Sequence, residues 1–197
     1  MHDAQIHPTA VIDEPATIGY RTKVWHFCHV CAGATIGQDC VLGQNVYVAS
    51  SAIIGDRCRI QNNVSIYDGV VLEPDVFVGP SVVFTNVVNP RAMISRRSEY
   101  RSTRVGRGAT IGANATILPG VSLGSFCFVG AGAVVTSDVA AHSLVLGVPA
   151  VPRGWMSRSG HQLTFLPGES ESICPGSGDR YRLNGMQVEL CPKVSSG

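Results

Sequence analysis

The sequence predicts an all-β protein, a parallel β-helix of about seven triangular coils with one protruding loop and a small C-terminal extension. Three observations lead to this fold class. A large apolar residue recurs every six positions, corner-forming residues follow it at a fixed offset, and the period is interrupted once. They divide the chain into a β-helix at 1–141, which contains a loop at 90–104, and a C-terminal cap and tail at 142–197 with a short hairpin.

The six-residue period runs from Ile6 to Phe84 without a slip and resumes from Val105 to Val135. Four positions after each large residue stands a small or β-branched one, from Ala10 to Val88 and again from Ala109 onward. An even separation along a strand places both side chains on one face. Each unit therefore directs one large and one small side chain inward.

The corners are predicted three positions after each large residue. This slot often holds Gly, Asn or Asp, which tolerate left-handed backbone. Three strand-and-corner units make one coil of eighteen residues, and stacking at the strand spacing of about 4.8 Å gives a prism roughly 30 Å long. The corner residues are Gly33, Asp39, Asn45, Asn63, Gly69, Asp75, Gly108, Asn114, Gly120, Gly132 and Asp138.

Composition excludes several classes of protein. The net charge of +1 and the 15% of charged residues argue against nucleic acid as a partner. The chain shows no signal-peptide pattern and no apolar run long enough to span a membrane, so we expect a cytoplasmic protein without a membrane partner.

The seven cysteines predict neither disulfides nor a metal site. Four of them fall in the small inward slot and read as buried apolar residues. His26 and His29 do not align with other histidines on adjacent coils, so no metal is expected. The inward cysteines are Cys28, Cys40, Cys58 and Cys127.

The single interruption, Pro90–Arg104, holds five arginines and no glycine. The faces of the prism are flat, so a cleft arises only where prisms pack side by side and a loop reaches across. Long loops on compact scaffolds often carry function. The alternative is a solvated excursion without a role.

The repeats IGQDCV, IGDRCR and IGANAT resemble those of the hexapeptide-repeat acyltransferases. The resemblance implies a left-handed helix, a homotrimer with sites between its subunits, and acetyl-CoA as co-substrate. The runs IHPTAVID, LGQNVYV, IQNNVSIYDGVVLE, FTNVVNPRA, RRSEYR and GVPAVPRGWMSRSGHQL resemble more closely the N-acetyltransferases acting on UDP-2-acetamido-3-amino-2,3-dideoxy-D-glucuronate in O-antigen and lipopolysaccharide biosynthesis. Close relatives use dTDP-3-amino-6-deoxyhexoses.

One departure from the wider family bears on the acceptor. Relatives that acetylate sugar hydroxyls carry a histidine base before their loop, and Asn89 stands in its place. An amide cannot take a proton at neutral pH, whereas a neutral amine already has a nucleophilic lone pair. The departure therefore points to N-acetylation by direct attack rather than to O-acetylation.

The resemblance, together with the stacking of residues eighteen apart, indicates which residues form the active site. Asn86 is the predicted catalytic residue, holding the amine or donating to the oxyanion; its alternative role is to bond its own backbone. The predicted substrate-binding residues are Gln61, Asn62, Tyr67, Asp68, Asn89, Arg91, Glu99, Tyr100, Arg101 and His26. The predicted acetyl-CoA-binding residues are Gly112, Ala113, Gly130, Ala131, Gly147, Pro149 and Arg153.

Two other functions compete with this interpretation. One is O-acetylation of a sugar, against which the missing loop histidine counts. The other is a non-catalytic β-helix scaffold or a module that only binds a nucleotide sugar. Release of free thiol from acetyl-CoA in the presence of an amino sugar would separate an enzyme from a scaffold.

Overall fold

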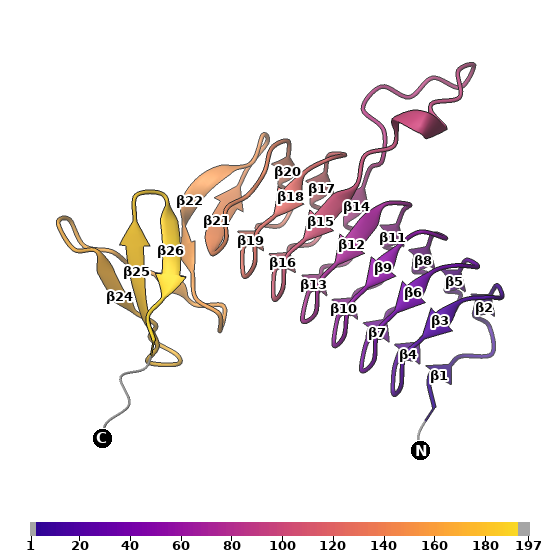
Figure 1. The fold of residues 1–197 in the computed structure, drawn as a ribbon, viewed down its shortest axis with the longest axis horizontal. Coiled ribbons are helices and arrows are strands. Elements are labelled where there is room, and N and C mark those ends of the chain that lie inside the picture. Colours follow the sequence, from indigo (N-terminus) through magenta and orange to yellow (C-terminus); the bar gives the residue numbers. More distant parts are fainter. Residues whose placement is uncertain (1–2, 193–197) are drawn as a thin grey trace.

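The computed structural model describes residues 3–192 and confirms a β-helix of stacked triangular coils (Figure 1). Three parallel sheets form its faces, and strands of one face pair at an interval of eighteen residues, as Gln5 does with Lys23. We name these sheets A, B and C in the order in which the chain first visits them.

The strands are short and their bounds follow the six-residue period. Sheet A contains β1 (Gln5–Ile6), β4 (Lys23–Val24), β7 (Val41–Leu42), β10 (Arg59–Ile60), β13 (Phe77–Val78), β16 (Thr110–Ile111), β19 (Phe128–Val129), β21 (Ser143–Leu146), β22 (Val151–Met156) and β23 (Gln162–Leu163). Sheet B contains β2 (Val11–Ile12), β5 (His29–Val30), β8 (Tyr47–Val48), β11 (Ser65–Ile66), β14 (Val83–Phe84), β17 (Thr116–Ile117) and β20 (Val134–Val135). Sheet C contains β3 (Thr17–Ile18), β6 (Thr35–Ile36), β9 (Ile53–Ile54), β12 (Val70–Leu72), β15 (Thr103–Val105) and β18 (Ser122–Leu123).

The inward side chains form one continuous core along the prism. Large residues from Val24 to Val135 are at most 2% exposed, and the four inward cysteines are buried beside them as predicted. Two inward predictions are wrong. Ile6 is 43% exposed because no coil lies beneath the first one, and Val88 is 59% exposed because the chain has already left the prism there.

The corners adopt left-handed backbone whether or not the residue type favours it. Asp39, Asn45 and most of the predicted set have positive φ, but Asp138 does not and instead accepts a hydrogen bond from the Ser122 amide. Arg21 and Phe126 take φ of 55° and 57° in the same slot. The closed coil therefore imposes the corner geometry on residues that do not prefer it.

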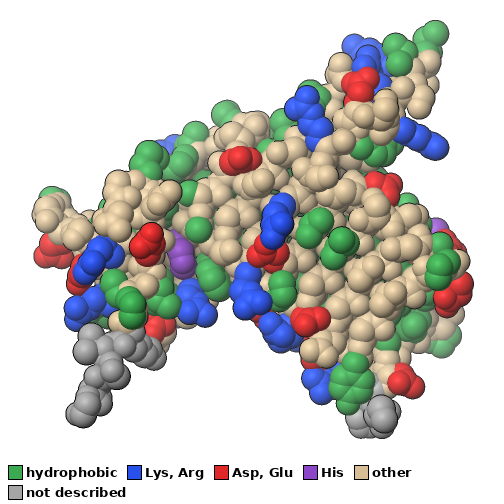
Figure 2. Space-filling model, in the orientation of Figure 1, with side chains coloured by type: hydrophobic (Ala, Val, Ile, Leu, Met, Phe, Trp, Pro, Cys, Tyr) green, Lys and Arg blue, Asp and Glu red, His purple; other side chains and the backbone are tan. Residues whose placement is uncertain are grey.

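The interruption forms an arm that stands clear of the prism and carries several Lys or Arg side chains (Figures 1 and 2). It leaves the prism after β14 and contains a short 3₁₀ helix, η1 (Arg97–Glu99). Its limits differ from the predicted 90–104. The amide of Arg101 donates to the carbonyl of Asn86 at 2.9 Å, which closes the base of the arm, and Thr103 already pairs with Val70.

The C-terminal extension continues sheet A and then adds a small sheet of its own. β21 pairs in parallel with β19, and β22 and β23 follow antiparallel. β24 (Glu171–Ile173), β25 (Arg180–Asn184) and β26 (Gln187–Leu190) form the small sheet. A second core of Leu163, Cys174, Tyr181 and Val188 lies under it.

Candidate functional site

The three edges of the prism differ in the side chains that they carry. Edge AB joins sheet A to sheet B, edge BC joins sheet B to sheet C, and edge CA returns the chain to sheet A. The predicted site residues of the prism fall on edges AB and BC, and none of them lies on edge CA.

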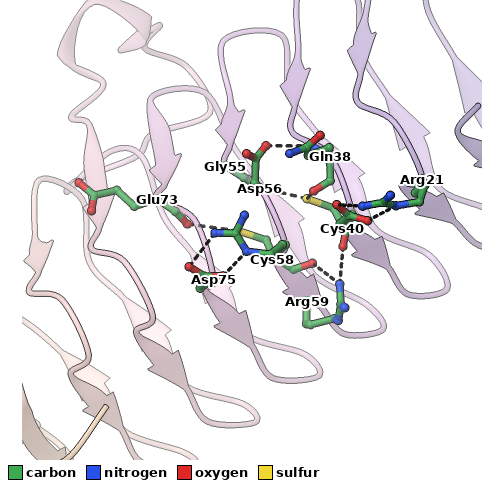
Figure 3. A network of polar contacts seen from close by, with 11 residues as sticks. Arg21, Gln38, Cys40, Gly55, Asp56, Cys58, Arg59, Glu73 and Asp75 are labelled. Atoms are coloured by element: carbon green, nitrogen blue, oxygen red, sulfur yellow. Dashed lines mark hydrogen bonds and ion pairs between the residues drawn. The ribbon is translucent and has the colours of Figure 1, made fainter. Parts of the chain in front are cut away.

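Edge CA carries a series of ion pairs and hydrogen bonds between successive coils (Figure 3). Arg21 binds Asp39 through two nitrogens at 2.5 and 2.6 Å, and Arg57 binds Asp75 in the same way at 2.6 and 3.0 Å. These residues lie eighteen apart in successive corner slots, so positive and negative side chains alternate along the edge. Each guanidinium holds the pKa of its aspartate below the usual range through the hydrogen bonds it donates.

Edge BC carries Asn86 at the base of the arm. Its carbonyl accepts from Arg101, and the hydroxyl of the preceding Thr85 donates to the Ile117 carbonyl at 3.0 Å. The backbone is thus fixed on both sides of a half-buried side chain. Among residues 3–192, the Asn86 side-chain amide has no hydrogen-bond partner, its own backbone included.

Asp68 and Tyr67 lie one coil below Asn86 on the same edge. The Asp68 carboxylate accepts from the amide and the hydroxyl of Ser51 at 3.1 and 2.9 Å, so it joins its own coil to the one beneath. Tyr67 is 39% exposed, and its ring centroid lies 6.0 Å from that of Tyr47. Asp68 therefore has a structural task, whereas Tyr67 is open to solvent.

The predicted residues of the arm are exposed, and several have partners within it. Glu99 accepts from Arg96 at 2.7 Å, and Arg91 donates to the Pro90 carbonyl at 3.2 Å. Asn89 and Tyr100 also lie on the solvated surface of the arm.

The lower part of edge AB holds a shallow cavity of about 280 Å³. His26, Gln61 and Asn62 line it together with Trp25, which the sequence analysis did not include in the site. The Asn62 side-chain oxygen accepts from the Gln44 amide at 2.9 Å, which directs that side chain toward the coil below. The eighteen-residue register is the signal that could have joined Trp25 to this group, since it lies in the same corner two coils beneath.

The upper part of edge AB holds the predicted acetyl-CoA residues. A Cβ on Gly112 would lie 2.5 Å from the Ala131 amide nitrogen, and one on Gly130 would meet the Leu146 side chain. Gly112 is therefore required by coil stacking, whereas at Gly130 the flexible end of the Leu146 side chain would have to move. Ala113 is half-buried and Ala131 exposed. The remaining three residues, Gly147, Pro149 and Arg153, lie exposed where the chain leaves β21 and enters β22.

A further polar group, which the sequence did not reveal, lies at the lower end of sheet B and edge BC. Asp13 contacts His29 Nε2 at 2.8 Å, and the Cys31 thiol, 4.0 Å from that nitrogen, donates to the Tyr47 hydroxyl at 3.4 Å. Asp13, His29 and Cys31 offer ligand-type atoms within 4.8 Å of one another. The Cys31 contact raises the pKa of Tyr47 to about 12, so this phenol stays protonated and is no general base at neutral pH.

The geometry thus places the predicted site in two halves. Asn86 and the arm lie on edge BC, and the cavity and the predicted acetyl-CoA residues lie on edge AB, with the whole of sheet B between them. A single chain does not bring the two halves together.

Comparison with known proteins identifies the class. A model of bacterial transferase hexapeptide repeats (six repeats) matches residues 102–137, and a model of the GMPPB C-terminal domain matches residues 1–98. The acetyltransferase domain of PglB from Neisseria gonorrhoeae FA1090 has a TM-score of 0.51 at 23% identity, covering 76% of this chain and 57% of that one. WeeI from Acinetobacter baumannii AYE has a TM-score of 0.51 at 22% identity, covering 74% and 56%. Both likenesses concern the fold.

A curated relative narrows the class. The dTDP-3-amino-3,6-dideoxy-alpha-D-galactopyranose 3-N-acetyltransferase of Aneurinibacillus thermoaerophilus is 36% identical over 177 residues, which cover 90% of each chain. The chain therefore belongs to the hexapeptide-repeat acetyltransferases, an acyltransferase family that folds as a left-handed parallel β-helix. The predicted family and fold are confirmed. Within residues 3–192, no helix has the length and apolarity needed to cross a membrane.

Proposed function

We propose that this enzyme transfers the acetyl group of acetyl-CoA to the C3 amine of a nucleotide-linked amino sugar. The 36% identical relative, a 3-N-acetyltransferase of a dTDP-linked amino sugar, supports the reaction class. Asn89 in place of a histidine supports an amine rather than a hydroxyl as the acceptor. The competing O-acetyltransferase would lack its base.

The observation that carries the proposal is the Asn86 side chain. It is half-buried beside the base of the arm, its backbone is fixed on both sides, and its amide has no partner within residues 3–192. A fixed amide donor of this kind suits the oxyanion of a tetrahedral intermediate or the attacking amine. Loss of one such donor slows other enzymes by about 10²–10³-fold.

The reaction needs no protein base. The neutral C3 amine attacks the thioester carbonyl, so that a C–N bond forms and a tetrahedral intermediate carries the negative charge on oxygen. Collapse breaks the C–S bond and releases CoA as the thiolate, which takes the proton lost by the nitrogen. The role assigned to Asn86 is to hold the amine or to donate its N–H to that oxygen.

We further propose that the working form is a homotrimer with three sites, each built between two subunits. Edge BC of one subunit would supply Asn86 and the arm. Edge AB of its neighbour would supply the cavity beside His26 for the nucleotide sugar and the upper groove for acetyl-CoA. This arrangement would unite the two halves that one chain keeps apart, and a closed ring is a common form of oligomer.

The first acceptor that we propose is UDP-2-acetamido-3-amino-2,3-dideoxy-D-glucuronate, which would place the enzyme in O-antigen and lipopolysaccharide biosynthesis. The arm supports it, because its arginines suit an acidic sugar. A second acceptor class, the dTDP-3-amino-6-deoxyhexoses, is supported by the substrate of the 36% identical relative.

A thiol-release assay with purified protein and acetyl-CoA tests the proposal. We expect turnover with the UDP-linked uronate and none with UDP-N-acetylglucosamine, which has a hydroxyl at C3. Turnover with the dTDP-linked sugar alone would keep the reaction and replace the acceptor. The absence of thiol release with either amino sugar would favour a non-catalytic binding module instead.

A further inference from the structure

The first coil of the prism, residues 5–22, has less core than the coils above it. No coil lies beneath it, so Ile6 is exposed, and Ile12 and Ile18 are only partly buried. Burial of apolar surface is the main stabilising contribution to a coil of this kind. Contacts outside the core therefore matter more in the first coil than elsewhere.

One group of outward side chains joins this first coil to the second. Asp13 follows β2 in the first coil, whereas His29 and Cys31 lie on and just after β5 in the second. β2 and β5 pair with Ile12 against Val30, so Asp13 lies directly beneath Cys31. Because Val30 points into the core, its two neighbours His29 and Cys31 both point outward on one face.

The backbone fixes these positions on both coils. The Asp13 amide donates to the Val30 carbonyl at 2.9 Å, and the Cys31 amide donates to the Val48 carbonyl at 2.9 Å. Cys31 is only partly buried, whereas the four inward cysteines of the prism are fully buried. Its thiol is therefore accessible as a ligand, beside a histidine and a carboxylate.

The three ligand atoms are spaced as they would be around one metal ion. His29 Nε2 is 2.8 Å from an Asp13 oxygen and 4.0 Å from the Cys31 sulfur, and all three atoms lie within 4.8 Å of one another. Metal–ligand bonds of about 2.0–2.3 Å place the ligands of a tetrahedral zinc ion roughly 3.3–3.7 Å apart, so these two distances need to change by about half an ångström or less. The side chains of His29 and Asp13 are 44% and 47% exposed, which leaves them free to adjust and open to an ion from solvent.

The ligand types indicate the class of ion. Thiolate, imidazole and carboxylate together suit Zn²⁺ and similar divalent ions, whereas Mg²⁺ and Ca²⁺ prefer oxygen ligands alone. The expectation of no metal considered only histidines that stack on one another. It did not consider one histidine beside a thiol and a carboxylate from the coil below.

We propose that Asp13, His29 and Cys31 bind a divalent ion of the zinc type, and that this ion joins the first coil of the prism to the second. Binding replaces the proton of the Cys31 thiol, which passes to solvent, and the neutral imidazole binds through Nε2. The site is separate from the proposed reaction, because Cys31 lies three coils, about 14 Å, below Thr85 at the base of the arm. The ion therefore stabilises the fold and takes no part in acetyl transfer.

Co²⁺ is the probe for this site, because it replaces Zn²⁺ and reports a thiolate ligand through a charge-transfer absorption band in the near ultraviolet. Full-length protein without an affinity tag, reduced and freed of metal by a chelator, would be titrated with Co²⁺ and then with Zn²⁺. The ligand variants are Asp13→Asn, His29→Gln and Cys31→Ser. Two controls are Cys191→Ser, another partly buried thiol, and His7→Gln, whose ring centroid lies 3.5 Å from that of a second histidine.

We expect one Co²⁺ per chain, with a thiolate band that Zn²⁺ removes. Cys31→Ser should lose the band, and the other two ligand variants should bind Zn²⁺ at least about tenfold more weakly, because even a change beside a metal ligand costs about 10–100-fold. Both controls should match the wild type.

The role of the ion in joining the coils has its own measurements. Zn²⁺ should raise the melting temperature of the wild type but not of Cys31→Ser, and it should slow amide hydrogen exchange in residues 5–18. The rate of acetyl transfer should be the same with and without the metal. Thermal unfolding of the metal-free variants verifies that each of them folds.

Several results would overturn the inference. If the folded wild type has a free Cys31 thiol and shows no thiolate band, these side chains only bind one another and Tyr47. A band that persists in Cys31→Ser, or binding that is lost in His7→Gln, would place the ion elsewhere. Binding without slower exchange in the first coil would remove its role in joining the coils, and loss of transfer in the metal-free protein would assign the ion to the reaction.

Discussion

Edges CA and BC are built from the same repeat, yet they differ in whether their polar side chains are paired. We call edge CA closed, because its corner side chains bind one another, and edge BC open, because two of its polar side chains do not. On edge CA, guanidinium and carboxylate groups alternate and bind one another from coil to coil (Figure 3). On edge BC, the Asn86 amide and the Arg101 guanidinium have no partners within residues 3–192. A repeat that pairs successive corner side chains along one edge, and leaves two polar side chains unpaired on another, suggests that these two have partners outside the chain.

The difference also explains why charge alone does not locate the site. Edge CA also carries arginines and acidic residues, so the presence of charge does not by itself favour edge BC. Arg21 and Arg57 on edge CA are already bound to aspartates, however, so they have little capacity left for a ligand. What distinguishes edge BC is the positioning of unpaired groups on a fixed backbone.

The largest effect that we expect comes from the open edge. Asn86→Ala should lower kcat by tenfold or more, toward the 10²–10³-fold typical of a lost oxyanion donor, while the melting temperature stays within about 2 °C of the wild type, because the amide has no partner to lose. The measurement is thiol release together with thermal unfolding. Asn63→Ala is the matched control, since Asn63 accepts from Asn45 at 3.1 Å on edge AB and should cost stability without slowing transfer. An unchanged rate in Asn86→Ala would remove this residue from the chemistry.

A smaller effect, on the free energy of unfolding, is expected from a change of Glu73, where the arm rejoins the prism. The Glu73 carboxylate receives the guanidinium of Arg104 and the amide of Arg107, and these bonds lower its pKa. Because the Arg104 side chain is 69% exposed and solvent screens the pair, Glu73→Gln should lower the free energy of unfolding by only about 1 kcal/mol. Glu169→Gln, an exposed carboxylate without such partners, is the control.

The Glu73 prediction has a defined pH dependence. A carboxyl group with a lowered pKa stabilises the fold above its unfolded pKa of about 4.3 and loses that contribution as the pH falls through the folded value. The difference in unfolding free energy between wild type and Glu73→Gln should therefore be constant from about pH 8 to pH 5 and shrink below about pH 4. A difference that shrank already near pH 6 would contradict this origin.

Acid sensitivity at higher pH should come from His142, in the last corner of edge CA. His142 is buried between the rings of Phe126 and Tyr181, its Nδ1 donates to the Met156 carbonyl at 2.8 Å, and burial lowers its pKa. A histidine with a lowered pKa gives full stability above its unfolded pKa of about 6.5 and loses it as the pH falls from there toward the folded value. Urea unfolding between about pH 7.5 and pH 5 should show this slope in the wild type and not in His142→Gln. An equal slope in both would assign the effect elsewhere.

The smallest effect should come from the closed edge. Asp75→Asn breaks the pair with Arg57, whose side chain is 45% exposed, and exposed pairs contribute little. We expect unchanged transfer and a slightly lower melting temperature, a difference that about 1 M salt removes. A large loss of activity would show that edge CA takes part in the reaction and would end the distinction between the edges.

The sequence was sufficient for the coils because the period states directly which side chains turn inward. The sequence misplaced the end of the arm. The six-residue period resumes at Val105, but the strand β15 already begins at Thr103. Asn86 and Asp68 were correctly placed on one edge by the eighteen-residue register. The register does not state which way a side chain turns, so the bond of Asp68 to Ser51 and the unpaired amide of Asn86 became visible only in three dimensions.

The strands on either side of the arm keep the register of the β-helix. β9 and β12 pair at an offset of 18 residues, as Ile53 and Val71 do, whereas β12 and β15 pair at 33, as Val70 and Thr103 do, and both pairings are in register. The arm is therefore inserted without a change in strand register, and the hydrogen bond from the Arg101 amide to the Asn86 carbonyl closes its base. Exchanging the arm between relatives should change the acceptor preference while the coils of the β-helix keep their structure.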